Sequence, residues 1–405
     1  MEPTGGPPPR SVTLVLVTPD GSVVGSLPPF EVAVPWWQEA GPVARGAREV
    51  FGIDVTVLRL LSAETPPAGG PITYLAEVAA PVAGARPWHG TLDDHPLRAS
   101  WARPGGAAAD LAWARGVLAE HGIAVTDRPD QVRAWNLSSL WRLPTADGAA
   151  WLKVVPPFFA HEGRLLERLE GWPVPRPIAV DGPRTLMPTL PGADLYEASG
   201  HVLLRMVTQL VELQSAWTGR AEGLLGIGLP DWRAAALIPA LADLVERSGG
   251  ELAAADVETL RAFVKALPER FAAIDACGIA ETLVHGDFHP GNHRGDGASL
   301  VLLDWGDSGV GHPLLDQAAF LDRIPAGDVE PVRVHWNETW RRRRPGSDPE
   351  RAASLLAPVA AARQALIYRG FLDRIEPSEH VYHASDPADW LTRTAALVRG
   401  PSGTA

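Results

Sequence analysis

The chain has 405 residues, of which 46% are hydrophobic and 21% are charged, and its formal net charge is −12. This composition is typical of globular proteins and excludes a disordered chain. The length predicts two or three domains. The acidic balance argues against nucleic acid as a partner, because nucleic acid binds to basic surfaces. The single cysteine, Cys277, excludes a disulfide framework, and without a membrane-spanning apolar run or a signal-peptide pattern we expect a cytoplasmic protein that does not contact a membrane.

The first predicted elements form a small αβ domain over residues 11–126, after a mobile N-terminus over 1–10 that is rich in proline and glycine. Its first two strands surround an Asp-Gly turn at 20–21. One helix is predicted to end at Gly52 and a longer one at Gly122, because glycine readily adopts the left-handed conformation that closes helices. Two further strands are predicted between these helices.

A small β-rich lobe is predicted over residues 130–190. Its first part, 132–155, has the pattern of a strand, an Asp-Gly turn and a second strand. An amphipathic helix follows over 158–171, and two short strands then lead to a crossover. The crossover opens a large α-rich lobe over 191–400, where helical periodicity dominates, first over 201–217. We therefore predict the α+β fold class, with two lobes that follow the αβ domain.

The polar stretch HGDFHPGN at residues 285–292 carries the clearest chemical signal. Phosphoryl transfer needs a base for the attacking hydroxyl, a metal that clamps the phosphates and a cation that holds them. Protein kinases take the first two from a loop of pattern D-x-x-x-x-N and from a later Asp on a second strand. Asp287 and Asn292 have this spacing, and Asp304 follows the apolar run LVLL. A turn at 294–297 would place Asn292 beside Asp304, so that both bind Mg²⁺ through oxygen.

The same chemistry requires a lysine on a strand and a glutamate on the next helix. Lys153 lies near the end of an apolar run, and Glu162 lies in the helix that follows, with Glu167 as the fallback partner. Lys153 is one of only two lysines in the chain, and Asn292 is one of only three asparagines. A residue type that a chain otherwise avoids is more often kept for its chemistry. The order Lys, Glu, Asp, Asn, Asp is a stronger signal than any one member.

Two other functions would use the same stretch. His285, Asp287, His289 and His293 are residue types that bind zinc or iron, which fits a metal-dependent hydrolase. That alternative leaves Lys153 without a role and puts many ligands on one short loop. The second alternative is a catalytically inactive, nucleotide-binding pseudokinase. The complete set of polar residues in the phosphate-transfer motif argues against it.

The stretches LVHGDFHPGN and LLDWGDSGVGHPLLDQAAFL resemble the aminoglycoside phosphotransferase and choline kinase-like family, and the resemblance extends over roughly 130–400. Members of that family have the protein-kinase-like fold. They transfer the γ-phosphate of ATP, and in some cases GTP, to hydroxyl groups of small molecules. The resemblance therefore implies an ATP- or GTP-dependent small-molecule kinase that uses Mg²⁺.

For the site, the resemblance implies that Asp287 is the catalytic base and that Asn292 and Asp304 bind Mg²⁺. It implies that Lys153 with Glu162 holds the phosphates of the nucleoside triphosphate. The small lobe lacks a glycine-rich phosphate loop, and WNLSSLW stands in that place. The remaining candidates for cofactor binding are Ser138, Ser139 and Met187.

The family does not define the phosphate acceptor, because its members act on antibiotics, choline, homoserine, sugars and fructosamines. Residues 191–330 hold 21 acidic and 9 basic residues, which is a balance of −12. An acidic region suits a cationic small molecule, so we expect an aminoglycoside or another cationic or sugar-like acceptor. The alternative is a solvated acidic surface without a binding role. The sequence does not indicate an oligomeric state.

Residues 41–61 of the αβ domain resemble the helix region of Nudix proteins. Arg48 and Glu49 match the Arg-Glu pair of that region, but Phe51 and Gly52 stand where the family carries two metal-binding glutamates. The resemblance therefore implies a Nudix-like module that does not hydrolyse nucleoside diphosphates. Such a module would act as a lid, a specificity element or a dimer contact. An αβ cap of another fold is the alternative.

Overall fold

The computed structural model describes residues 6–64, 68–296 and 298–400, and the chain folds into two compact units. The segments of the first unit are Met1–Gly163, Pro177–Thr189 and Leu372–Ala384. The segments of the second unit are Arg164–Arg176, Leu190–Phe371 and Ser385–Ala405. The combination of sheets and many helices confirms the predicted α+β class. Residues 1–5 of the predicted mobile N-terminus lie outside the described residues.

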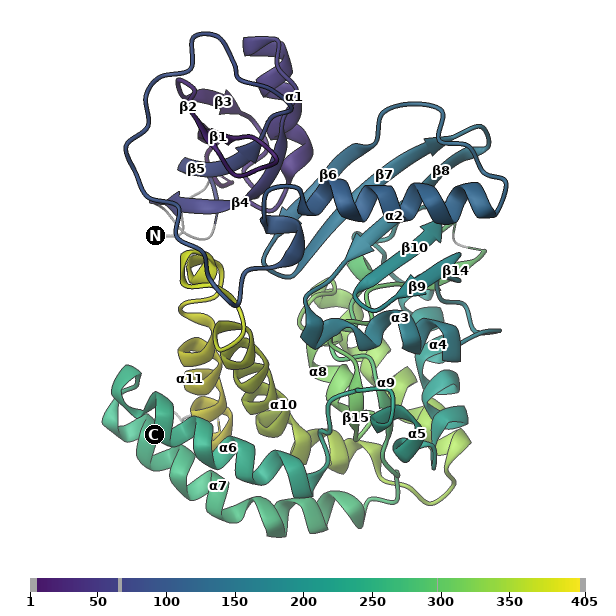
Figure 1. Ribbon diagram of the computed structural model, residues 1–405. Coiled ribbons are helices and arrows are strands. Elements are labelled where there is room, and N and C mark those ends of the chain that lie inside the picture. Colours follow the sequence, from purple (N-terminus) through teal and green to yellow (C-terminus); the bar gives the residue numbers. More distant parts are fainter. Residues whose placement is uncertain (1–5, 65–67, 297, 401–405) are drawn as a thin grey trace. The chain divides into compact units, whose positions relative to one another are not determined.

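The first unit begins with a five-stranded sheet and a helix packed on it (Figure 1). The bounds are Arg10–Val17 (β1), Val23–Ser26 (β2), Phe30–Val32 (β3), Ala40–Phe51 (α1), Thr56–Ala63 (β4) and Gly70–Glu77 (β5). The strand order is β2-β1-β5-β4, with β3 paired to β1, and β1 runs parallel to β5. Alternate side chains of β1, such as Val12 and Leu14, are buried together with Val43 and Ala47 of α1.

Helix α1 contains the predicted Nudix-like pair. It ends as predicted at Gly52, which has φ +69° and donates its N–H to the Arg48 carbonyl at 3.0 Å. Arg48 and Glu49 are exposed, and Arg48 forms an ion pair with Asp54 at 2.7 Å. Because ion pairs between exposed side chains contribute little to stability, this contact does not explain why the pair is present. The Nudix-like nature of this module stays a prediction.

A second five-stranded sheet of the first unit is covered on one face by helix α2 (Gly106–Glu120) (Figure 1). The strands are Asp130–Trp135 (β6), Ser138–Thr145 (β7), Gly148–Val154 (β8), Ala179–Asp181 (β9) and Arg184–Pro188 (β10). Their order is β6-β7-β8-β10-β9. Ala114 and Leu118 of α2 pack with Leu143 of β7 and Leu152 of β8. The sequence pattern predicted two strands over 132–155, but a turn without glycine or proline separates β6 from β7.

Buried polar contacts join the two sheets of the first unit. The Gln131 side chain on β6 accepts a hydrogen bond from the Val57 N–H at 2.8 Å and donates one to the Val57 carbonyl at 2.7 Å. The short helix η5 (Pro377–Tyr382) supplies Glu379, whose Oε1 accepts a hydrogen bond from the Leu60 N–H at 2.9 Å. The predicted αβ domain and the predicted small lobe therefore meet within one compact unit, and their separate folding stays a prediction.

The buried carboxyl of Glu379 is expected to make stability depend on pH. Burial raises the pKa of Glu379 to about 8, against the hydrogen bond from Leu60, and the charge of Glu376 adds to the rise. A carboxyl with a raised pKa in the folded state stabilises the protein below its ordinary pKa, and this contribution is lost as pH rises through the folded pKa. Between pH 4.5 and about 8, we expect the melting temperature of the wild type to fall relative to that of Glu379→Gln. Parallel melting curves of the two proteins across this window would contradict the prediction.

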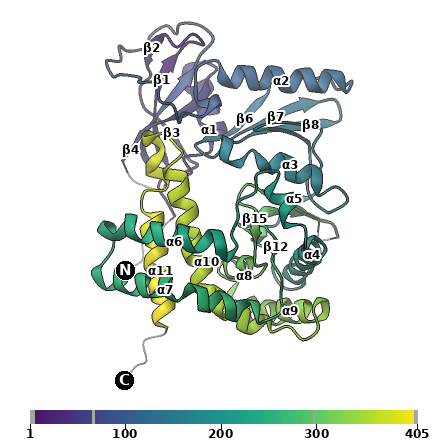
Figure 2. The same cartoon turned by 60° about the horizontal axis from the view of Figure 1, so that its bottom comes forward.

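The second unit is mostly helical, as the periodicity predicted. Its helices are His201–Trp217 (α4), Ala221–Leu225 (α5), Ala234–Ser248 (α6), Ala254–Asp275 (α7), Leu315–Leu321 (α8), Ala326–Arg343 (α9), Pro349–Leu372 (α10) and Asp386–Arg399 (α11). The bounds of α4 are those predicted, and α7 packs against both α6 and α11 (Figure 2). Among the helices of the described ranges, none is long and apolar enough to cross a membrane.

Short strands of the second unit hold the polar stretch that carries the chemical signal. They are Ala193–Asp194 (β11), Thr282–Val284 (β12), His293–Gly295 (β13), Leu300–Leu302 (β14) and Gly309–Gly311 (β15). β12 pairs with β15, and β13 pairs with both β14 and β11. The HGDFHPGN stretch begins directly after β12, and Asp304 lies just beyond the end of β14. These strand ends fix the backbone from which the candidate site residues project.

Candidate functional site

The predicted site residues fall into two groups, one in each compact unit. The first unit contains Lys153, Glu162, Ser138, Ser139 and Met187. The second unit contains Asp287, Asn292 and Asp304.

Lys153 and Glu162 form an ion pair in the first unit. Lys153 lies on β8, and Glu162 lies in the first turn of α3 (His161–Arg168). The Lys153 Nζ atom is 2.7 Å from Glu162 Oε1, and the two side chains are only 17% and 5% exposed. Desolvation offsets much of the attraction in such a pair, so the pair adds little to stability. Its presence is better explained by a functional role of the two side chains. The fallback partner, Glu167, is exposed.

The hairpin between β6 and β7 contains the WNLSSLW stretch, which occupies the position in the chain that a glycine-rich phosphate loop would take. Ser138 Oγ accepts a hydrogen bond from Trp135 Nε1, and Ser139 Oγ accepts one from Trp141 Nε1, both at 3.0 Å. Both serines are buried, so a phosphate contact at this hairpin would have to use backbone N–H groups. Met187 lies on β10 beside β8 and is half-buried.

A buried carboxylate anchors the loop that follows β12. Asp316, in the first turn of α8, accepts hydrogen bonds from the backbone N–H of His285 at 2.9 Å and of Gly286 at 2.8 Å. Arg363 of α10 donates to the Gly286 carbonyl at 2.8 Å. Burial raises the pKa of Asp316, while the charge of His285 and the two backbone donors oppose the rise. Asp316 and Arg363 therefore fix the position of the backbone immediately before Asp287.

Gly286 is expected to be essential for this loop. Its φ is +92°, and a Cβ atom added there would lie 1.9 Å from the Asp307 carbonyl oxygen. We predict that Gly286→Ala lowers the melting temperature and abolishes turnover, because both the backbone and Asp307 would have to move. Gly346→Ala is the matched control, since Gly346 has φ +85° but no atom within 4 Å of the added Cβ. Equal effects of the two substitutions on melting and on activity would contradict the prediction.

Asp287 is surrounded by hydrogen-bond donors. Arg323 Nη1 donates to Oδ1 at 2.6 Å, Asn292 Nδ2 donates to Oδ2 at 3.2 Å, and His289 Nε2 lies 3.4 Å from Oδ2. Burial alone would raise the pKa of Asp287, but the hydrogen bond of His289 and the charge of Arg323 outweigh it and hold the pKa well below its usual range. Asp287 is therefore ionised at neutral pH, which is the state in which a carboxylate accepts a proton from a hydroxyl.

A hairpin of β13 and β14 brings Asn292 next to the segment that carries Asp304. The Leu303 N–H donates to the Asn292 carbonyl at 2.7 Å. The turn was predicted at 294–297, but Arg294 and Gly295 lie on β13, paired with Val301 and Leu300, so the strand extends into the predicted turn; Gly297 lies outside the described residues. Asp304 is exposed and has φ +59°, the only positive φ of a non-glycine residue in the described part of the chain. Such a conformation costs about 1–3 kcal/mol and is typical of functional positions.

The donor set of this hairpin fits Mg²⁺. Asn292 Nδ2 donates to both the backbone carbonyl and the carboxylate of Asp287, which leaves the amide Oδ1 as the group that can face a cation. The exposed Asp304 supplies a carboxylate. Amide and carboxylate oxygens are ligands that Mg²⁺ accepts, and it completes its shell with water and phosphate oxygens. Bound Mg²⁺ would neutralise charge on the phosphates.

The three histidines of the loop take part in packing and backbone contacts. His285 Nε2 bonds to the Leu303 carbonyl at 2.8 Å, and His293 Nδ1 bonds to the His289 carbonyl at 3.2 Å. Burial lowers the pKa of His285, and it lowers the pKa of His293 to about 3. His289 Nδ1 accepts a hydrogen bond from the Gly291 N–H at 3.0 Å. Within the described ranges, no group of three or more His, Cys, Asp or Glu side chains is arranged to hold a metal.

No sequence pattern identified two arginines that contact this loop. Arg323 lies 36 positions after Asp287, and Arg363 lies 77 positions after Gly286. No local spacing rule connects residues so far apart. Arginine accounts for all but two of the 36 basic residues in this chain, so the residue type gives no signal either.

Comparisons with known proteins bear on the family and on the fold. A family model described as the phosphotransferase enzyme family matches residues 131–355, which is more than half of the chain. A putative aminoglycoside phosphotransferase from Ralstonia eutropha JMP134 is 17% identical with a TM-score of 0.51, over 72% of this chain and 98% of that one. A choline/ethanolamine kinase family protein from Mesorhizobium loti is 16% identical with a TM-score of 0.51, over 72% of this chain and 95% of that one. The curated proteins searched gave no match.

Proposed function

Because the chain belongs to the phosphotransferase enzyme family, we propose that it transfers the γ-phosphate of ATP, or of GTP, to a hydroxyl group of a small molecule. The observation that carries the proposal furthest is Asp304, which has a strained backbone and follows a hairpin that also positions Asn292. A conformation of this cost is expected where an exposed carboxylate has to be held in one orientation.

The ionised Asp287 supports a role as the catalytic base. Its carboxylate would align the acceptor hydroxyl and take its proton as the oxygen attacks phosphorus. Asp316 and Arg363 fix the backbone just before Asp287, and Asn292 donates to its Oδ2, so the carboxylate is held in place before a substrate binds. Such preorganisation reduces the entropy that the reaction must lose.

Lys153 and Glu162 support a role in holding the nucleotide. The ammonium group of Lys153 would pair with phosphate oxygens, and Glu162 would keep the long lysine side chain in one orientation at 2.7 Å. Asn292 and Asp304 would hold Mg²⁺ through oxygen. Met187 and the backbone of the β6–β7 hairpin complete the proposed nucleotide contacts.

The acceptor is proposed to be a cationic or sugar-like molecule, with aminoglycosides as one class. The acidic balance of residues 191–330 supports a cation. Arg323 donates to Asp287 at 2.6 Å, and its positive charge would repel a second positive charge directly beside the reacting hydroxyl. We therefore expect the positive group of such an acceptor to lie some distance along the molecule from the hydroxyl that is phosphorylated.

A combined binding and transfer screen tests the function. Aminoglycosides, choline, sugars and amino alcohols are tested with ATP and with GTP, each with Mg²⁺, by melting temperature and by γ-phosphate transfer. We expect a nucleotide with Mg²⁺ to raise the melting temperature and at least one acceptor to gain phosphate. A melting temperature that no nucleotide changes would contradict both kinase activity and nucleotide binding. Nucleotide binding without transfer to any acceptor would favour the pseudokinase alternative.

Arg323 is expected to set the pH range in which Asp287 is active. Its charge lowers the pKa of Asp287, so Arg323→Ala raises that pKa towards the usual range. A base works only above its pKa, so we predict that the acidic limb of the kcat/KM profile moves to higher pH in Arg323→Ala. Arg333→Ala is the control, because Arg333 is equally exposed but pairs with Glu330 at the surface. An unchanged acidic limb in Arg323→Ala would show that Arg323 does not act on the base.

A further inference from the structure

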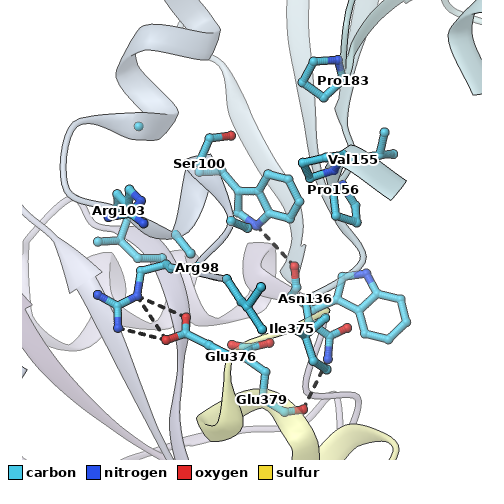
Figure 3. A pocket seen from close by; sticks show the side chains of 18 of the residues that line it. Arg98, Ser100, Arg103, Asn136, Val155, Pro156, Pro183, Ile375, Glu376 and Glu379 are labelled. Carbon is cyan, nitrogen blue, oxygen red and sulfur yellow. Dashed lines mark hydrogen bonds and ion pairs between the residues drawn. The ribbon is translucent and has the colours of Figure 1, made fainter. Parts of the chain in front are cut away.

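A pocket of about 830 Å³ lies within the first unit, and every residue that lines it belongs to that unit (Figure 3). Its volume is in the range of sites that bind small molecules. The walls come from the segment before α2, from the β6–β7 hairpin and from the segment at 374–379. The β6–β7 hairpin is shared with the proposed nucleotide contacts, but the proposed phosphate-transfer side chains do not line the pocket: Lys153, Glu162, Asp287, Asn292 and Asp304.

Most of the pocket wall is apolar. Trp101, Trp135 and Phe158 contribute aromatic rings, and Pro156 and Ile375 contribute aliphatic surface. The polar ends of the two tryptophans are already used, because Trp101 Nε1 donates to the Trp135 carbonyl at 3.2 Å and Trp135 Nε1 donates to Ser138 Oγ. The rings therefore present apolar surface to an occupant.

One of the two carboxylates of the pocket is already neutralised. Figure 3 shows Glu376 beside the guanidinium group of Arg98. Arg98 Nη2 is 2.8 Å from Glu376 Oε2, and Arg98 Nε lies within 3.2 Å of both carboxylate oxygens. Arg59 adds a second positive charge at 3.5 Å, and all three side chains are at most 10% exposed. The charge of Glu376 is therefore balanced by two arginines, and both of its carboxylate oxygens accept hydrogen bonds from Arg98.

Glu379 is the described pocket residue that has a buried side-chain oxygen without a hydrogen-bond partner. Its Oε1 accepts a hydrogen bond from the Leu60 N–H, but within the described residues its Oε2 has no hydrogen-bond partner although it is buried. Leaving such an oxygen without a partner costs about 1–3 kcal/mol. The charged or titratable groups that act on Glu379 or respond to it are Glu376, Arg59, Tyr74 and Tyr382.

We propose that the pocket binds a small, largely apolar molecule that carries one protonated amine, and that Glu379 holds this amine. On binding, the Glu379 side chain turns so that Oε2, which is buried in the empty protein, faces the pocket; its carboxyl then releases its proton to solvent, and an N–H of the ammonium group donates to Oε2. The apolar remainder of the ligand covers the aromatic rings of the wall. Neither Lys153 nor Asp287 nor Asp304 lines this pocket, and binding of the amine does not depend on phosphate transfer.

The pocket favours an amine over an anion. Three arginines line the pocket, and each already has a partner: Arg98 pairs with Glu376, Arg103 pairs with Asp94 at 2.7 Å, and Arg374 lies 4.4 Å from the centroid of the Phe158 ring. An anionic ligand would therefore have to displace one of these contacts, and it would also meet Glu379. A neutral alcohol would satisfy Oε2 with a hydrogen bond but without charge. An amine forms a charge-assisted hydrogen bond, which is roughly twice as strong as a neutral one. Because the raised pKa keeps Glu379 protonated in the empty protein, binding of the amine is linked to proton release.

Calorimetric titration of the full-length protein with three probes of one shape tests the proposal. The probes are 3-phenylpropylamine, 3-phenylpropan-1-ol and 3-phenylpropanoic acid. We expect the amine to bind most tightly, and titrations in buffers of different ionisation enthalpy to show proton release. Glu379→Gln is expected to weaken amine binding by at least about tenfold and to remove the proton release, while binding of the alcohol changes little.

Three further variants test whether the amine binds in this pocket and not elsewhere on the protein. Ser100 is exposed and lines the pocket, so Ser100→Trp is expected to fill it and abolish binding of both the amine and the alcohol. Glu49→Gln, at an exposed position of α1, and Asp287→Asn are expected to leave amine binding unchanged. No binding of the amine to the wild type, binding unaffected by Ser100→Trp, or binding lost only in Asp287→Asn would each overturn the proposal. Should Glu379→Gln fail to fold, proton release in the wild type and the result for Ser100→Trp decide the question.

Discussion

Replacing Asp304 with alanine is expected to abolish phosphate transfer and to weaken Mg²⁺-dependent nucleotide binding together. The proposed role of its carboxylate is to hold Mg²⁺ between the phosphates, and metal and nucleotide bind as a unit. Alanine tolerates the φ of +59° at this position less well than aspartate does, so the variant is expected to be slightly less stable than the wild type as well as inactive.

The measurements are the dissociation constant of ATP with and without Mg²⁺, the turnover rate and the melting temperature. Asp243→Ala is the control, because Asp243 is a largely exposed carboxylate on α6. Lys153→Ala is expected to resemble Asp304→Ala, with Lys265→Ala as its control, since Lys265 is the only other lysine and is exposed. Full nucleotide affinity and activity in Lys153→Ala would defeat the kinase proposal.

Replacing Asp287 with asparagine is expected to lower turnover by roughly two to four powers of ten, the usual range for loss of a general base. Nucleotide affinity is expected to change little, because the proposed partner of Asp287 is the acceptor hydroxyl and not the phosphates. Asparagine keeps the shape of the side chain but places an amide where Arg323 donates to a carboxylate at 2.6 Å. Turnover at saturating nucleotide and the dissociation constant of ATP measure the two effects separately.

The pattern across variants distinguishes the kinase from the hydrolase alternative. A metal hydrolase predicts that changes at Asp287, His289 and His293 all release a bound transition metal, and that Lys153→Ala has no effect. The kinase proposal predicts that a change at His293 acts through the packing of the loop, that a change at His289 also removes its contact with Asp287, and that neither change releases a metal. Metal analysis of the purified variants, combined with their nucleotide affinity, therefore separates the two. A nucleotide affinity that falls as strongly in Asp287→Asn as in Asp304→Ala would contradict the separate roles.

Local features of the sequence predicted much of the secondary structure. Helix α4 has the predicted bounds, and α1 ends at the predicted Gly52, because helical periodicity and left-handed glycines act over a few neighbouring residues. The turn between β6 and β7 was missed, because it contains neither glycine nor proline and its strands continue the same apolar pattern. The spacing of Asp287, Asn292 and Asp304 was visible because one loop and one hairpin carry all three.

The sequence by itself thus determined the fold class, most of the order of the elements and the spacing of Asp287, Asn292 and Asp304, since each of these depends on residue types at short, regular spacing. Only the tertiary structure decided that Arg323 contacts Asp287 and that Asp316 anchors the loop. It also decided that Glu379 lies in an apolar pocket beside residues more than 200 positions earlier in the chain. Contacts of this kind arise when distant segments pack together, and no local preference of the chain encodes which of its many arginines or glutamates will meet there.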